Sequence, residues 1–247
     1  MKLVPSVDLR DFLSGDPERK QKFVNEIGKA YEEIGFVALK GHFLDNKLVD
    51  ELYGEVKNFF DLPVETKQKY EIPGIGGQRG YVGFGKETAK GFKKGDLKEF
   101  WHFGQYLEDV SKYSSVYPDN VEVSEVPKFN EVGKEAYKML EKTGVYVLRA
   151  LALHLGLDEF YFDKFVSEGN SILRPIHYPP ITEEPDNAVR AAAHGDINLI
   201  TLLMGAQGKG LQVMNHDGEW VDAIAEPDEL MINVGDMLSR HTNNKLK

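Results

Sequence analysis

The stretch that decides the fold is residues 192–213, which read AAHGDINLITLLMGAQGKGLQV. A histidine, His194, and an aspartate, Asp196, stand two positions apart just before the apolar, β-rich run of residues 197–204. Side chains two positions apart in an extended chain project from the same face. An imidazole and a carboxylate at a strand edge supply two of the three protein ligands of the two-histidine, one-carboxylate site that suits non-haem Fe(II).

This pair alone is weak evidence, because histidine and aspartate fall two apart by chance in many chains. A structural histidine held by hydrogen bonds is the alternative interpretation. The pair follows three alanines, residues 191–193, and precedes a strongly β segment. That context raises the weight of metal binding, and both interpretations stay open at this point.

Outward from this stretch, the chain divides into a helix-rich part, residues 1–170, and a strand-rich part, residues 171–247. Apolar residues at helical spacing and capping residues predict helices over residues 18–34, 46–59, 125–155 and 159–166. Short apolar or alternating runs predict strands over residues 4–9, 36–39, 97–103, 172–178, 196–204, 211–214, 220–223 and 229–234. This order predicts an α+β fold with a jelly-roll or antiparallel barrel core, and one domain over residues 1–247.

Residues 74–95 are dense in glycine and carry several basic and aromatic side chains. A phosphate cradle is one interpretation, but neither GxxxxGK[ST] nor the GxGxxG spacing occurs here. A mobile loop, a lid or a substrate-facing wall is therefore the favoured interpretation. Arg79 and Lys86 in this segment hint at a substrate that bears a carboxylate.

Composition excludes several classes of function. A formal net charge of −10 without a basic block argues against nucleic acid as a partner. The chain has no cysteine, so a transition metal would be held by His, Asp or Glu. No apolar run reaches the length of a membrane span, and the first residues do not read as a signal peptide. We therefore expect a cytoplasmic protein without a membrane partner.

Several motifs in order resemble the isopenicillin N synthase-like family of Fe(II) oxygenases, which mostly depend on 2-oxoglutarate. They are VPSVDL (4–9), IGFVALKGH (34–42), RGYVGFGKETAKG (79–91), DLKEFWHFG (96–104), ILRPIHYPP (172–180), the stretch at 192–213 and NVGDMLSRHTNNKLK (233–247). The resemblance covers nearly the whole chain and is greatest to the bacterial members. It implies a double-stranded β-helix, or jelly-roll, core with the N-terminal and central helices packed on it.

The resemblance also implies the cofactors and the residues that bind them. Fe(II), 2-oxoglutarate as co-substrate and O2 are expected. His194 and Asp196 match the family's first two iron ligands. Tyr178 matches the tyrosine that approaches the co-substrate or a metal-bound water. Ile176 stands where many plant members have an asparagine, so that polar contact is not expected.

Two further polar residues beside Tyr178 have open roles. Arg174 and His177 either line the pocket or are satisfied strand residues. His241 is a candidate for a distal ligand, but it lies upstream of the matching NNKLK segment. A partly exposed side chain, or one near the cofactor entrance, is the favoured interpretation of His241.

In the family, the third iron ligand, a histidine, follows the segment that matches NNKLK. An arginine and, two residues later, a serine that bind 2-oxoglutarate come after it. The sequence ends at Lys247, before these positions. This predicts a jelly roll that is incomplete at its C-terminus and impaired catalysis if the chain is complete, or else a longer polypeptide.

The sequence thus predicts a non-haem Fe(II)- and 2-oxoglutarate-dependent oxidoreductase that hydroxylates, desaturates or cyclises a small molecule. The alternative is a non-catalytic fragment or a scaffold or binding protein that keeps the fold. A cofactor-independent metal hydrolase is less favoured, because no general base is convincingly placed. Fold alone does not identify the substrate.

Overall fold

A computed structural model describes residues 4–88, 95–107, 117–182, 189–205, 211–214 and 218–247. The chain forms two compact units, each assembled from segments that are distant in sequence. The first unit comprises Met1–Asp45, Leu140–Phe165 and Gly195–Lys247. The second comprises Asn46–Met139 and Val166–His194. The prediction of one domain over residues 1–247 stays a prediction.

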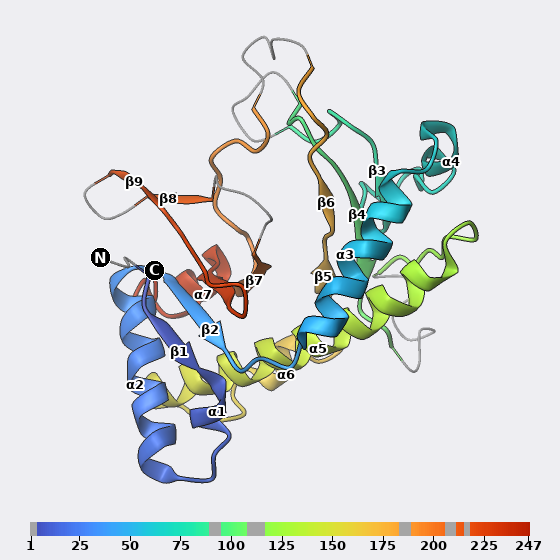
Figure 1. The fold of residues 1–247 in the computed structure, drawn as a ribbon. Helices are drawn as coiled ribbons and strands as arrows, with labels where there is room; N and C mark the ends of the chain where they lie inside the picture. The colour runs from blue at the N-terminus through green and yellow to red at the C-terminus, as the bar shows by residue number, and fades with distance from the viewer. Residues whose placement is uncertain (1–3, 89–94, 108–116, 183–188, 206–210, 215–217) are drawn as a thin grey trace. The chain divides into compact units, whose positions relative to one another are not determined.

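The first unit is built on a four-stranded sheet in the order β1-β2-β10-β7 (Figure 1). Its strands are β1 (Ser6–Asp8), β2 (Phe36–Lys40), β10 (Leu230–Val234) and β7 (Ile200–Met204). β1 pairs in parallel with β2, whereas β10 is antiparallel to both of its neighbours. β1 is thus an edge strand, which agrees with the proline at its start. A hairpin of β8 (Gln212–Met214) and β9 (Trp220–Asp222) belongs to the same unit.

The first unit also contains four helices, of which only Val166 at the end of α6 is assigned to the second unit. They are α1 (Leu9–Phe12), α2 (Pro17–Glu33), α6 (Asp163–Val166) and α7 (Asp236–His241). The second part of α5 (Pro127–His154) belongs to the same unit. α2 begins where the Asp16 carboxylate accepts hydrogen bonds from the amides of Glu18 and Arg19, with Pro17 at the first helical position. It ends at Glu33, and Gly35, two residues later, has a φ of 75° that glycine adopts without strain.

The packing of α2 on α5 depends on Gly28, a buried glycine in the middle of α2. A methyl group at this position would overlap the ring of His154, which hydrogen-bonds to Glu32 at 3.0 Å. Gly28→Ala is therefore expected to destabilise the protein by about 1–3 kcal/mol, as overpacked cores are. The matched control is Gly54→Ala in α3 (Asn46–Phe60), where nothing lies within 4 Å of the new methyl group.

The control variant is expected to stabilise the protein by about 0.5–1 kcal/mol, because alanine is the better helix former. Urea unfolding of both variants against the wild-type protein measures the two differences. Equal effects of the two substitutions would contradict the close approach of α2 and His154.

The second unit contains α3, α4 (Val64–Gln68), the first part of α5 and a small antiparallel sheet. Its strands are β3 (Gly80–Val82), β4 (Glu99–Gly104), β5 (Ile172–Leu173) and β6 (Ile176–His177). β4 is central and pairs with the other three. Aromatic rings from α3, β4 and α5 meet in the core, where Phe59 stacks on Phe129 at 4.8 Å and Trp101 is fully buried.

The two faces of β4 carry different chemistry, because strand side chains alternate. Trp101 and Phe103 point to the aromatic core of the unit. Glu99 projects to the same face of β4 as Trp101 and Phe103, and it pairs with His177 of β6. The opposite face carries Phe100 and His102. This face, which we call the β4 polar face, also includes Arg174, whose side chain contacts both residues.

Most predicted elements are confirmed, and the mixed α+β content agrees with the expected class. Three differences concern the site. The strand expected over residues 196–204 begins only at Ile200, so His194 and Asp196 precede it in irregular backbone. The strand expected over residues 172–178 is two short strands, β5 and β6, that flank Arg174 and Pro175. The segment 74–95 contains β3, and its residues 89–94 lie outside the described residues.

Helix α7 was not expected from the sequence. Residues 206–210 of the glycine-rich break also lie outside the described part of the chain. No described helix combines the length and the apolar character needed to cross a membrane.

Candidate active site

Asp196 lies in the first unit, just before β7, with a half-buried carboxylate. Its Oδ2 accepts hydrogen bonds from Thr201 Oγ1 at 2.5 Å and from Asn233 Nδ2 at 2.8 Å. The donors come from β7 and β10, which pair with each other. The two strands therefore hold the carboxylate in one orientation.

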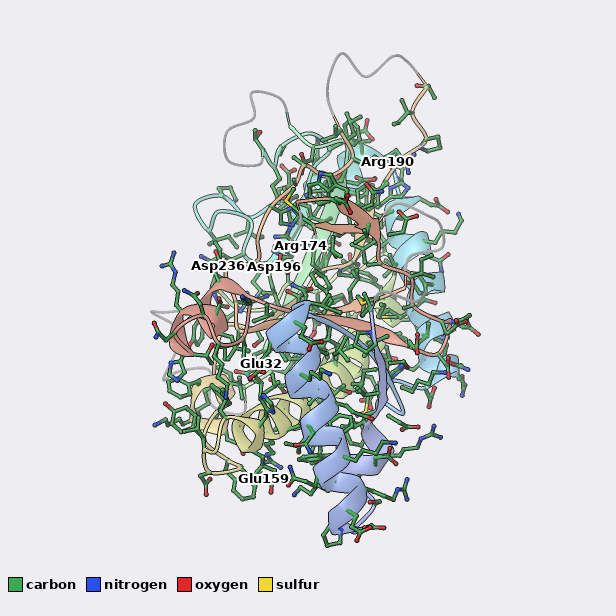
Figure 2. The ribbon with its side chains drawn as sticks, turned by 90° about the vertical axis from the view of Figure 1, so that its left-hand side faces the viewer. Glu32, Glu159, Arg174, Arg190, Asp196 and Asp236 are labelled. Carbon is green, nitrogen blue, oxygen red and sulfur yellow. The ribbon has the colours of Figure 1, made fainter. Side chains whose placement is uncertain are left out.

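The backbone next to this carboxylate is held by the start of α7. The amide of Asp236 donates to the carbonyl of Asp196 at 2.7 Å, and the amide of Met237 donates to the carbonyl of Asn198 at 3.2 Å. Figure 2 shows the side chains of Asp196 and Asp236 next to each other. The segment that carries Asp196 is thus fixed by a helix as well as by the sheet.

His194 lies in the second unit and is exposed. Its Nδ1 is 2.7 Å from the carbonyl oxygen of Ala192. A carbonyl can only accept, so Nδ1 carries the proton and Nε2 carries the lone pair in the neutral ring. A metal-binding histidine is commonly oriented in this way, with its other nitrogen donating to a backbone carbonyl.

These local arrangements fit a divalent metal such as Fe(II). A neutral imidazole nitrogen and an ionised carboxylate are donors that non-haem Fe(II) accepts. Hydrogen bonds that orient each donor are typical of metal ligands. Among the residues that the structure describes, no three His, Asp or Glu side chains form a group that could hold a metal ion. The assignment of His194 and Asp196 as metal ligands stays a prediction.

His241 is not part of this arrangement. Its Nε2 is 3.0 Å from the hydroxyl of Tyr161, and its ring packs against Tyr161, Phe162 and Phe165 with centroids 5.5–5.8 Å apart. The side chain is exposed at the end of α7. The interpretation of His241 as a partly exposed residue is confirmed.

Tyr178 follows β6 in the second unit, close to four charged side chains. Burial raises the pKa of its hydroxyl, and the nearby Lys98, Asp96, Arg174 and Glu87 act on it in opposing directions. The hydroxyl therefore stays protonated at neutral pH and can donate a hydrogen bond. Lys98 is buried and pairs with Glu87 at 2.7 Å and Asp96 at 2.9 Å.

Arg174 is held by His102 and Glu87. Its Nε donates to His102 Nε2 at 2.6 Å, and its Nη1 lies 3.1 and 3.3 Å from the two carboxylate oxygens of Glu87. The carbonyl of Gly77 accepts from His102 Nδ1 at 2.6 Å, which leaves Nε2 as the acceptor for Arg174. Burial, together with the charge of Arg174, lowers the pKa of His102 to about 4.

Protonation of His102 should therefore destabilise the fold in acid. The folded-state pKa of about 4 lies below the ordinary 6.5, so this stability is present above pH 6.5 and is lost as the pH falls from 6.5 to 4. The difference corresponds to roughly 3 kcal/mol at pH 4. Between pH 7 and pH 4 the free energy of unfolding of the wild-type protein should therefore fall by about 3 kcal/mol more than that of His102→Gln, as measured by urea unfolding. The same pH dependence in both proteins would contradict the prediction.

The structure separates the two residues whose roles the sequence left open. Arg174 belongs to the β4 polar face, near Tyr178. His177 belongs to the opposite face, where its Nδ1 is 2.7 Å from Glu99. His177 is thus a satisfied strand residue, whereas Arg174 joins the cluster around Tyr178.

The Glu99 side of the sheet contains a cavity with a volume of about 350 Å³. Its lining comprises Val64, Lys67, Gln68, Tyr81, Gly83, Phe84, Lys86, Glu99 and Pro179. Lys86 is part of this lining, whereas Tyr178, His194 and Asp196 are not. Arg79 and Lys86, which hinted at an acidic substrate, have protein partners: Arg79 bonds to Gln78 and Asn170, and Lys86 pairs with Glu71.

The cluster of His102, Glu87, Lys98 and Asp96 was not predicted from the sequence. In β4 the run EFWHFG is apolar or aromatic on both faces, so alternation does not mark His102 as special. Arg174 is 72 residues from His102 in the sequence, so no short motif connects the two residues.

Comparison with known proteins identifies the family. The model described as "non-haem dioxygenase in morphine synthesis N-terminal" matches residues 4–125, and that of the "2OG-Fe(II) oxygenase superfamily" matches residues 169–247. The 2-oxoglutarate-dependent dioxygenase frbA of a Dothideomycetidae species is 32% identical over 99% of this chain and 76% of its own length. The chain belongs to the 2OG-Fe(II) oxygenase superfamily.

Solved structures of this superfamily show the same fold. A 2OG-Fe(II) oxygenase family protein from Caulobacter crescentus is 41% identical, with a TM-score of 0.88 over 100% of this chain and 78% of its own. A full-length protein from Neurospora crassa, solved in complex with alpha-KG and thymine, is 28% identical, with a TM-score of 0.85 over 99% and 77%. The predicted α+β, jelly-roll fold class and the 2-oxoglutarate-dependent dioxygenase activity are confirmed at the level of the superfamily.

As a superfamily member, the protein is an Fe(II)- and 2-oxoglutarate-dependent oxidoreductase that acts on a small molecule and uses O2. The residues that bind the metal and the co-substrate are not assigned by these likenesses.

Proposed function

We propose that His194 and Asp196 bind the Fe(II) of this 2-oxoglutarate-dependent dioxygenase and that Tyr178 contacts the 2-oxoglutarate. The setting of Asp196 carries the proposal. Its carboxylate accepts two hydrogen bonds, from Thr201 and Asn233, on strands that are far apart in sequence. Orientation of this kind is expected for a ligand carboxylate.

When bound, Fe(II) supplies the redox chemistry by which O2 oxidises 2-oxoglutarate and the substrate. The chain's own residues prepare the site for it. Thr201 and Asn233 hold Oδ2 of Asp196 in one orientation. The hydrogen bond from Nδ1 of His194 to the Ala192 carbonyl leaves the lone pair of the neutral ring on Nε2, the nitrogen that we assign to the metal.

Tyr178 has a different task. Because burial raises the pKa of its hydroxyl, the group is neutral at physiological pH and donates rather than accepts towards an anion. A carboxylate oxygen of 2-oxoglutarate is a suitable acceptor.

Succinate formation tests the function directly. The protein is incubated with Fe(II), ascorbate, 2-oxoglutarate and O2, and succinate is followed by NMR with and without a metal chelator. Succinate above background that the chelator abolishes supports the enzyme. Background succinate, together with no binding of 2-oxoglutarate, would favour the non-catalytic scaffold or fragment instead.

The finer parts of the proposal concern partners and location. The net charge of −10 supports a small molecule rather than nucleic acid as the partner. A cytoplasmic location is proposed as well, and cell fractionation tests it. The substrate is limited to small molecules, and its chemical class is the subject of the next inference.

A further inference from the structure

The β4 polar face gathers an arginine whose guanidinium is oriented by three contacts. Arg174 is fixed through Nε by His102 and through Nη1 by Glu87. Its guanidinium carbon also lies 4.4 Å from the centre of the Phe100 ring. Fixing a planar fork in this way lowers the entropy lost when the next hydrogen bond forms.

The contacts leave one end of this fork for another molecule. Among the residues that the structure describes, none accepts a hydrogen bond from Nη2 of Arg174. About a third of the side chain is exposed, at 33%. Arg174, labelled in Figure 2, comes from the segment between β5 and β6, four residues before Tyr178. Arg174 is among the charged groups that act on the pKa of Tyr178.

Buried charge around this face is not balanced within the described chain. Arg79 is 2% exposed and bonds to neutral groups, the Gln78 carbonyl and the Asn170 amide oxygen. No described carboxylate pairs with it, and its buried Nε has no hydrogen-bond partner among the described residues. A buried cation without a counter-ion is costly, and an anion nearby offsets part of that cost.

Among the five described charged residues named for this face, cations outnumber anions by one. Arg79, Arg174 and Lys98 are positive, whereas Glu87 and Asp96 are negative. Glu87 serves both Arg174 and Lys98, so Arg174 has only a shared counter-ion. An anionic ligand at this face would restore neutrality.

We propose that Arg174 recognises a carboxylate on the small-molecule substrate through its Nη2 group. Charge-assisted hydrogen bonds of this kind are about twice as strong as neutral ones. The enzyme should therefore prefer an acid over the matching neutral amide. This inference rests on the proposed function, in which Tyr178, four residues after Arg174, contacts the 2-oxoglutarate.

The test compares acids with amides of the same shape. Dissociation constants are measured by ligand-observed NMR for benzoate and benzamide, phenylacetate and phenylacetamide, and hexanoate and hexanamide. The protein is saturated with 2-oxoglutarate and Mn(II), a redox-inert stand-in for Fe(II). The wild-type protein is expected to bind at least one acid about 10- to 100-fold more tightly than its amide.

The variants assign that preference to one residue. Arg174→Gln should reduce the acid-to-amide ratio to near one, while Arg174→Lys, which keeps the charge but not the fork, should give an intermediate value. The matched control is Arg149→Gln, another arginine that pairs with a carboxylate, Asp163 at 2.6 Å, and lies over an aromatic ring. It should leave the ratio unchanged.

Three results would overturn the inference. The first is a wild-type acid-to-amide ratio near one, or no binding of either the acids or the amides. The second is a ratio that Arg174→Gln leaves unchanged. The third is a loss of 2-oxoglutarate affinity in Arg174→Gln that is as large as its loss of acid affinity. The last would assign Arg174 to the co-substrate. Failure of the wild-type protein to bind 2-oxoglutarate at all would count against the proposed function, which separates the two failures.

Discussion

Alanine in place of Asp196 is expected to weaken Mn(II) binding by more than about 100-fold. Loss of a residue that merely orients a metal ligand costs about 10- to 100-fold in affinity, and loss of the ligand itself should cost more. Mn(II) is chosen because the free ion has a strong electron paramagnetic resonance signal that disappears on binding. A titration followed by this signal gives the dissociation constant without any turnover.

The neighbours of the carboxylate provide a graded comparison. Thr201→Val and Asn233→Leu each remove one hydrogen bond to Oδ2 and should weaken Mn(II) binding by about 10- to 100-fold. His194→Ala should act like Asp196→Ala, whereas Asp222→Ala, an exposed carboxylate on β9, should have no effect. Tight binding that survives both Asp196→Ala and His194→Ala would exclude these residues as the ligands.

The largest expected effect on folding comes from Lys67→Met. Lys67 Nζ contacts both carboxylate oxygens of Glu99 at 2.9 and 3.0 Å, and both side chains are about 95% buried. Hydrogen bonds from Lys67, Tyr81 and His177 hold the pKa of Glu99 below its ordinary value despite burial, which raises it. Removing the ammonium leaves this carboxylate buried with less compensation, at a cost of about 3–5 kcal/mol.

A double variant separates the charge from the packing. Lys67→Met combined with Glu99→Gln removes both charges and should be more stable than Lys67→Met alone. The surface control is Lys57→Met, whose partner Asp61 is exposed, and it should change stability by less than about 0.5 kcal/mol. Urea unfolding at pH 7 gives all three values. A cost below about 1 kcal/mol for Lys67→Met would show that the pair is weakly coupled to folding.

Periodic segments could be predicted from the sequence because burial imposes their spacing. In β10 the residues Leu230 and Ile232 are fully buried, and the expected strand over residues 229–234 differs by one residue at its start. Helix α5 differs from the expected 125–155 by two residues at its start and one at its end. These elements follow directly from one apolar face.

The start of β7 could not be predicted in this way. The sequence pattern predicts strand over residues 197–199, yet their backbone hydrogen-bonds to the start of α7. The carbonyls of Asn198 and Leu199 accept from the amides of Met237 and of Gly235, the N-cap of α7. A composition pattern cannot show which distant segment will take a carbonyl. The break between β5 and β6 does have a local cause, because Pro175 has no amide hydrogen to donate to a sheet.

The candidate site was predictable only where a motif carried it. His194, Asp196 and Tyr178 came from the resemblance to a family, and their assignment remains a proposal. Their supporting groups, such as Asn233 beside Asp196, lie tens of residues away and are brought close only by strand pairing. No spacing rule in a single sequence connects them.

Side chains alternate between the two faces of β4, so substitutions at neighbouring positions of this six-residue strand should have different effects. Trp101 and Phe103 support the aromatic core, so substitutions there should be selected against for folding whatever the substrate. Phe100 and His102, which are 3% and 5% exposed, lie on the opposite face with Arg174. A library that varies residues 100, 102, 174 and 176 should therefore be screened for folding and for substrate range together, while Trp101 and Phe103 stay unchanged.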